Sequence, residues 1–301
     1  MIFIFLSILS HSAMNIPNKE MGRRFGTLKG STLIQDFSIV FWASIVMLCT
    51  GAFAVPKPRF ILLSLAFGML YLSTMFLHLM AIKTGTLGDS TMMINLGLFL
   101  SALYGIFVYN DKVTILTGIG MACMLAVIFL SMPSKSERKE NPNKVKWFLA
   151  ALGSLICNGG LSIVKRIVAE FNKVDVSETI DMKNYLIWGY AFAGVICLII
   201  ALFARPPKTT FKTLYTGKNL PIVLLFGLIA GAGTAGGTLF QMMAISHGVS
   251  SAIVYPVCAG SLITIGWLLS VIYYKDIKIT VKNVISLILC VAGIVVTQIK
   301  I

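Results

Sequence analysis

Two stretches of this sequence, Phe76–Ile82 (FLHLMAI) and Leu239–Ile245 (LFQMMAI), match each other 163 residues apart. Both lie inside long apolar runs. Each carries one polar side chain at the same place, which is His78 in the first stretch and Gln241 in the second. The match indicates a chain built from two related halves.

Other landmarks occur in the same order in both halves. Phe53–Pro56 (FAVP) resembles Phe203–Pro206 (FARP), and each follows the second apolar run of its half. Tyr109–Lys112 (YNDK) resembles Tyr274–Ile277 (YKDI), and each precedes the last run. Because chance does not explain a shared order of landmarks, we interpret the chain as a tandem repeat.

The composition is that of a membrane protein. The 301 residues are 57% hydrophobic and only 12% charged, with a mean hydropathy of +0.89, whereas a soluble domain is about 25% charged. So little charge excludes a soluble enzyme, a secreted disulfide scaffold and a disordered chain. The net charge of +14 comes from basic residues in short loops. The lipid bilayer explains these loops, and we expect no nucleic-acid partner.

Ten runs are long and apolar enough for a membrane helix, which needs about 20 such residues. They cover about residues 1–18, 33–54, 60–82, 90–108, 113–132, 146–167, 184–204, 220–245, 249–273 and 280–299. Backbone groups in lipid must pair within their own segment, and the runs lack the alternation of membrane strands. The expected fold is therefore all-α and integral to the membrane, with ten transmembrane helices.

The repeat assigns five helices to each half. We expect the first repeat at 1–132, a polar linker at 133–145 and the second repeat at 146–301. Tandem repeats with an odd number of helices have opposite orientations in the membrane. This is the inverted-repeat plan of secondary transporters, which places a substrate site near the membrane midplane between the halves.

This plan, with the ninth run and its exit, resembles the drug/metabolite transporter superfamily, and specifically its EamA-type members. The resemblance is carried by Ser251–Val257 (SAIVYPV), Gly266–Leu269 (GWLL) and Lys275-Asp276. Members show small residues, an aliphatic run, a proline, a Gly-aromatic stretch and then Gly-Glu here. Asp276 stands where glutamate is usual, and Asp111 does so in the first half.

The resemblance implies a solute carrier of a bacterial inner membrane, with no cofactor and no covalent chemistry. Its cavity would lie between the halves, lined mainly by segments one, three, four, six, eight and nine. Relatives move amino acids, nucleotide sugars, sugar phosphates or other metabolites, so the expected partner is a small-molecule solute. A homodimer is left open.

Polar side chains inside the membrane are costly, so each is a candidate for binding substrate. His78 and Gln241 are paired by the repeat. His11 and Asn15 lie one turn apart in the first run, and Asn158 falls near the His11 position in the second half. The alternative for each is a hydrogen bond between helices, worth about 1 kcal/mol or less.

Asn95 in the fourth run and Tyr255 in the ninth complete the candidate substrate-binding residues. Lys165 and Arg166 end the sixth run, where such residues usually reach toward the headgroups. The functional alternative is a cationic mouth that attracts anions. Close helix packing is predicted at Gly227–Thr238, because small residues recur there every four positions.

The acidic residues restrict the substrate class. Of 11 Asp and Glu, only Asp36 and Asp89 fall at helix edges, and none lies in the middle of a run. A cation site is hard to build without a carboxylate, so we expect a neutral, zwitterionic or anionic metabolite such as an amino acid. His11 and His78 are the only expected proton carriers, and proton coupling is left open.

Three other functions are weighed against transport of a metabolite. A multidrug or cation exporter and a lipid-flipping membrane subunit are the alternatives that the sequence permits. A membrane enzyme acting on lipids would need a catalytic cluster, and no H-E-x-x-H or G-x-S-x-G motif occurs. The six cysteines lie singly in apolar runs, so we expect no metal site.

Overall fold

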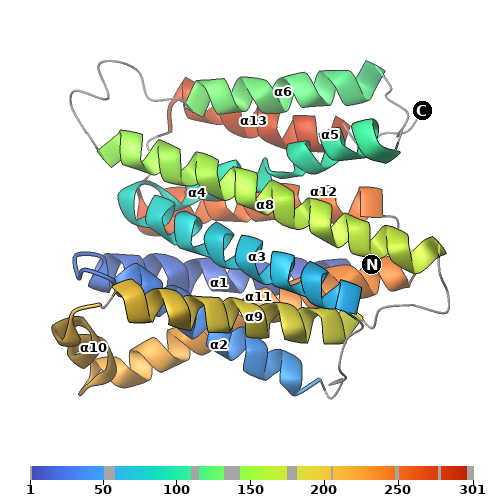
Figure 1. Cartoon of the computed structure of the whole chain (residues 1–301). Coiled ribbons are helices and arrows are strands. Elements are labelled where there is room, and N and C mark those ends of the chain that lie inside the picture. Colours follow the sequence, from blue (N-terminus) through green and yellow to red (C-terminus); the bar gives the residue numbers. More distant parts are fainter. Residues whose placement is uncertain are drawn as a thin grey trace.

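The computed structural model describes residues 2–50, 58–109, 115–131, 143–174, 182–204, 206–247, 251–276 and 279–296. Every regular element within these ranges is a helix, which confirms the all-α prediction for this part of the chain. The first half forms α1 (Ile2–Phe25), α2 (Ser31–Leu48), α3 (Pro58–Thr84), α4 (Leu87–Asn95), α5 (Leu98–Tyr109) and α6 (Ile115–Ser131). The second half forms α8 (Asn143–Val174), α9 (Met182–Ala204), α10 (Lys208–Tyr215), α11 (Asn219–Ser246), α12 (Ser251–Leu268), the π-helical η2 (Leu269–Tyr274) and α13 (Val281–Val296). Figure 1 shows most of these helices lying lengthwise side by side in one bundle.

Six segments of the described chain are long and apolar enough to cross a membrane. They are Ser31–Leu48, Phe60–Thr84, Asn143–Val168, Lys183–Ala204, Asn219–Ala244 and Val257–Tyr274. The apolar helices at Gly118–Val127 and Val281–Val296 are shorter. These six segments indicate an integral membrane protein. The presence of ten transmembrane helices stays a prediction.

The fourth expected helix, 90–108, is divided in two at Leu96 and Gly97. α4 begins early, because Thr86 caps it by accepting a hydrogen bond from Asp89 N at 3.2 Å. At Gly97 the backbone meets α8 so closely that an added Cβ would lie 2.7 Å from Leu155 O. The break therefore accompanies a tertiary contact that an apolar run cannot reveal.

Two further elements lie outside the expected set. The short helix α10 carries Lys208 and Lys212 and lies at one end of the bundle (Figure 1). It is fixed there because Thr210 Oγ1 donates a 3.0 Å hydrogen bond to Lys29 O, and Leu214 is buried. The ninth run ends in the π-helical turn η2, which brings Asp276 back toward α1.

Glycines set the closest approaches between helices. At Gly68 in α3 an added Cβ would lie 2.7 Å from Gly189 O in α9. At Gly231 in α11 it would lie 2.7 Å from Ile39 O in α2. Gly231 follows Gly68 by the same 163 residues that separate the two matching stretches. Glycine thus lets these backbones touch, as predicted for the stretch around Gly231.

Candidate functional site

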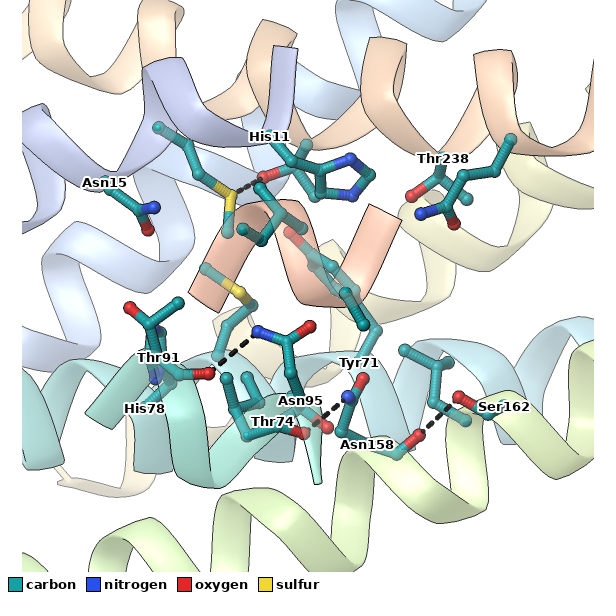
Figure 2. A pocket seen from close by; sticks show the side chains of 18 of the residues that line it. His11, Asn15, Tyr71, Thr74, His78, Thr91, Asn95, Asn158, Ser162 and Thr238 are labelled. Atoms are coloured by element: carbon teal, nitrogen blue, oxygen red, sulfur yellow. Dashed lines mark hydrogen bonds between the residues drawn. The ribbon is translucent and has the colours of Figure 1, made fainter. Parts of the chain in front are cut away.

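A cavity of about 110 Å³ lies between α1, α3, α4, α8, α11 and α12. These are the six segments that the resemblance predicts around a substrate site. The space is large enough for several water molecules or a small solute. Figure 2 shows the polar side chains that project toward it from these helices.

Most of the candidate residues from the sequence meet at this cavity. Six of them line it: His11, Asn15, His78, Asn95, Asn158 and Gln241. The seventh, Tyr255, lies in α12, and its side chain is outside the described part of the chain. The structure thus brings six predicted residues together, while their binding of substrate stays a prediction.

The two asparagines at the α4–α8 contact have backbone partners. Asn158 Nδ2 donates to Ile94 O at 2.8 Å, which joins α8 to α4. Asn95 Nδ2 donates to Thr91 O, one turn back in its own helix, at 2.7 Å. Figure 2 shows both bonds at the cavity wall. Asn158 therefore makes the interhelical hydrogen bond that was considered as the alternative to substrate binding. Its side chain nevertheless also lines the cavity.

Two hydrogen bonds that both involve Ser7 connect His11 to α11. Ser7 Oγ donates to Gly237 O at 2.9 Å, and His11 Nδ1 lies 3.1 Å from Ser7 O. A carbonyl only accepts, so Nδ1 carries the proton and Nε2 of the neutral ring is an acceptor. A side chain at position 237 would overlap the His11 ring, so the glycine makes room for the imidazole.

Several polar groups of the cavity have no partner. His78 is 1% exposed, and its buried Nδ1 lacks a hydrogen bond within the described ranges. The buried hydroxyls of Thr74 and Thr91 also lack one there. Buried polar groups in native proteins are normally hydrogen-bonded. Unsatisfied groups that gather around one cavity therefore mark a place where a polar molecule can be bound.

Sequence reasoning missed several polar residues of the wall. The additional ones are Tyr71, Thr74, Thr91, Ser162, Thr234 and Thr238. Most lie at helical spacing from a predicted residue, as Tyr71 and Thr74 do from His78, and Ser162 does from Asn158. This spacing is a signal that could have found them.

The position of Lys165 differs from the expectation. The sixth run was expected to end near Lys165 and Arg166, but α8 continues to Val174. Lys165 is therefore an interior residue of the helix, and its side chain lines the cavity. No Asp or Glu side chain lines the cavity in the part of the chain that the structure describes.

Asp36 was expected at a helix edge, and the structure places it close to the start of α2 but deep in the bundle. It lies in the second turn of α2 and is 0% exposed. Neither carboxylate oxygen has a hydrogen-bond partner among the described residues. The helix begins at Ser31, before the apolar run, so that Asp36 enters the bundle. Asp36 does not line the cavity.

A buried ion pair holds the helices together at the end of the bundle where α1 ends. Lys19 Nζ lies 2.8 Å from Asp276 Oδ2, and it donates to Gly85 O at 3.0 Å and to Ile82 O at 3.3 Å. Nearby, Tyr274 donates to Ile16 O at 3.4 Å. This ion pair joins α1, the turn between α3 and α4, and the end of η2. Neither of its charged residues lines the cavity.

No metal centre is found in the described part of the chain. Groups of three or more His, Cys, Asp or Glu side chains that could hold a metal ion do not occur among those residues.

Comparison with known proteins identifies the fold alone. The chain is similar to a protein of known crystal structure, with a TM-score of 0.60 and 15% sequence identity over 98% of this chain and 95% of that one. No family model matches the sequence. No curated protein matches it either.

Proposed function

We propose that the chain is a secondary transporter, an EamA-type member of the drug/metabolite transporter superfamily, that works by alternating access in a bacterial inner membrane. The solute would be a small neutral, zwitterionic or anionic metabolite such as an amino acid. The observation that supports this most is the polar cavity at the centre of an apolar bundle. There His78, Thr74 and Thr91 present unpartnered groups.

The unpartnered groups argue for a ligand rather than for packing. Burying a polar group without a hydrogen bond costs about 1–3 kcal/mol. Valine in place of Thr74 or Thr91 would fill nearly the same volume without that cost. The hydroxyls are therefore explained by something that they bind, and a transported solute satisfies them in turn.

The helix contacts support two inverted five-helix repeats. We pair α1 with α8, α2 with α9, and α3 with α11. Exchanging the partners converts the observed contact α1–α11 into α8–α3, and α3–α9 into α11–α2, both of which are also observed. The close approaches at Gly68 and Gly231 exchange in the same way. Such a pseudo-twofold relation is typical of transporters that alternate between two openings.

Uptake into proteoliposomes tests this proposal. The assay would use labelled neutral amino acids, sugar phosphates and one lipophilic cation, with and without a pH gradient. We expect uptake of a metabolite, reduced at least tenfold in Thr74→Val. Ser44→Ala is the matched control, since Ser44 donates to Val40 O in its own helix and does not line the cavity.

Other outcomes would refute the proposal in distinct ways. Uptake of the cation alone would favour a multidrug exporter. Absence of uptake together with lipid scrambling by the same vesicles would favour a lipid-flipping subunit. Normal uptake in Thr74→Val, His78→Ala and Gln241→Ala would show that this cavity is not the transport site.

A further inference from the structure

We infer that the cavity recognises an anionic group of its solute, a carboxylate or a phosphate, through Lys165, while the uncharged remainder of the solute lies toward Thr74, His78 and Thr91. This inference rests on the proposed transport function and names the class of solute. It follows from the position of Lys165, from its lack of partners and from the absence of acidic side chains in the described cavity wall.

Lys165 belongs to a continuous polar face of α8. Asn158, Ser162 and Lys165 follow one another at spacings of four and three residues, so they lie on one side of the helix. All three line the cavity. Lys165 is of intermediate solvent exposure, so it is not sealed inside the helix contacts.

Other lysines in similar surroundings have partners. Lys19 pairs with Asp276 and donates to two carbonyls. Lys83 donates to the hydroxyls of Ser31 and Thr32. Lys165 has no hydrogen bond or ion pair within the described ranges, although it lies near enough to interact electrostatically with His11. A strongly hydrated ammonium that faces a cavity without a counter-ion is a ready partner for an anion.

The neighbours of Lys165 do not neutralise it. Ser162 Oγ already donates to Asn158 O at 2.9 Å, and Asn158 donates to Ile94 O. The ring of His11 contributes no negative charge. Because no described acidic side chain lines the wall, an anion would meet one positive charge and no repelling carboxylate. A cation would be repelled by Lys165 and would find no carboxylate to attract it. The local positive potential therefore favours anions.

The other end of the cavity is uncharged. Figure 2 shows His78 and Thr91 on one side of Asn158, and Ser162 and Thr238 on the other. Lys165 lies about one turn beyond Ser162, away from His78. The site therefore has a cationic end and a neutral hydrogen-bonding end. A small solute with an anionic group at one end and hydrogen-bonding polar groups at the other fits this arrangement.

Binding to the purified full chain tests the inference without requiring transport. Thermal unfolding midpoints would be measured in neutral detergent with matched pairs of probes, namely lactate with lactamide and glycerol 3-phosphate with glycerol. We expect at least one anion to raise the midpoint and its neutral partner to have no effect. The loss of one charge-assisted hydrogen bond should weaken anion binding by about 10- to 100-fold in Lys165→Met.

The variants separate charge from folding. Lys165→Arg keeps the charge and is expected to retain anion binding within about tenfold. Lys146→Met is the control, because Lys146 is an exposed residue in the first turn of the same helix and does not line the cavity. If Lys165→Met fails to fold, the anion-induced rise of the thermal midpoint is measured in Lys165→Gln and Lys165→Arg instead. We expect the rise to be lost in Lys165→Gln and kept in Lys165→Arg.

Each contrary result has a defined meaning. Failure of every anion to stabilise the wild type, or equal stabilisation of wild type and Lys165→Met, would overturn the inference. Stabilisation by vesicles of anionic phospholipid but not by soluble anions would assign Lys165 to a lipid headgroup, which also overturns it. Uptake of a neutral solute would then leave transport intact. Anion binding that depends on Lys165 without any uptake would instead refute the transport proposal alone.

Discussion

The ion pair between Lys19 and Asp276 is expected to give unequal losses of stability when each partner is removed. Lys19 Nζ has two carbonyl acceptors besides the carboxylate, at 3.0 and 3.3 Å. The carboxylate oxygens of Asp276 have no hydrogen-bond partner in the described structure and depend on the Lys19 charge at 2.8 Å. Lys19→Met therefore leaves a charge alone, whereas Asp276→Asn leaves a lysine that is still bonded.

The burial of the pair sets the magnitude. The side chains of Lys19 and Asp276 are 10% and 23% exposed. Breaking a fully buried pair costs about 3–5 kcal/mol, and an exposed pair contributes about 0.2–1 kcal/mol. Between these limits we expect Lys19→Met to lower the free energy of unfolding by about 2 kcal/mol and Asp276→Asn by about 1 kcal/mol. The double variant should lose about 1 kcal/mol less than the sum.

Unfolding in mixed micelles with increasing dodecyl sulfate, followed by tryptophan fluorescence, measures these differences. The neighbouring pair between Arg23 and Glu20 is the control, because the Arg23 side chain is 61% exposed. Arg23→Ala should change the unfolding free energy by less than about 0.5 kcal/mol. Equal losses in the two single variants, or a strictly additive double variant, would refute the assignment of the carboxylate as the dependent partner.

Three further predictions concern the interior. Gly237→Val should lower the thermal midpoint and abolish uptake, because the side chain would overlap the His11 ring; an unchanged midpoint would contradict this packing. Thr74→Val should maintain or raise the midpoint while uptake falls, since it removes a buried hydroxyl without a partner; a loss of stability would show a structural bond instead. Asp36→Asn should fold with at least the wild-type midpoint, because it keeps the shape and removes an unpaired buried carboxylate. A large decrease in the midpoint of Asp36→Asn would reveal a partner for that charge.

Hydropathy predicts where the helices of this chain lie better than it predicts the residues at which they begin and end. An apolar run marks the part of a helix that lipid requires, whereas the helix itself continues wherever backbone bonds are made. For this reason α8 extends past Lys165 to Val174, and α2 begins before Asp36. The break at Gly97 depends on the approach of Leu155 O from another helix. Small residues spaced four apart from Gly97 predict a close approach there, but not that the helix breaks.

The sequence predicts those residues of the candidate site whose side chains are rare inside a membrane. A histidine or an amide inside an apolar run is costly, and this cost selected His11, His78 and Gln241 from the sequence. Hydroxyls such as those of Thr74 and Thr91 are common in membrane helices because their own turn can accept their proton. Only the structure shows that these two lack that bond.

The contact between α1 and α11 has a consequence for biosynthesis. Ser7 Oγ donates to Gly237 O, and these residues are 230 positions apart. Because α1 is synthesised long before α11, it carries Ser7, His11 and Asn15 into the membrane before the partner of Ser7 exists. Until α11 and α12 have been synthesised, α1 must be sheltered by the insertion machinery or by earlier helices. The final packing of α1 is thus delayed until α11 has been synthesised.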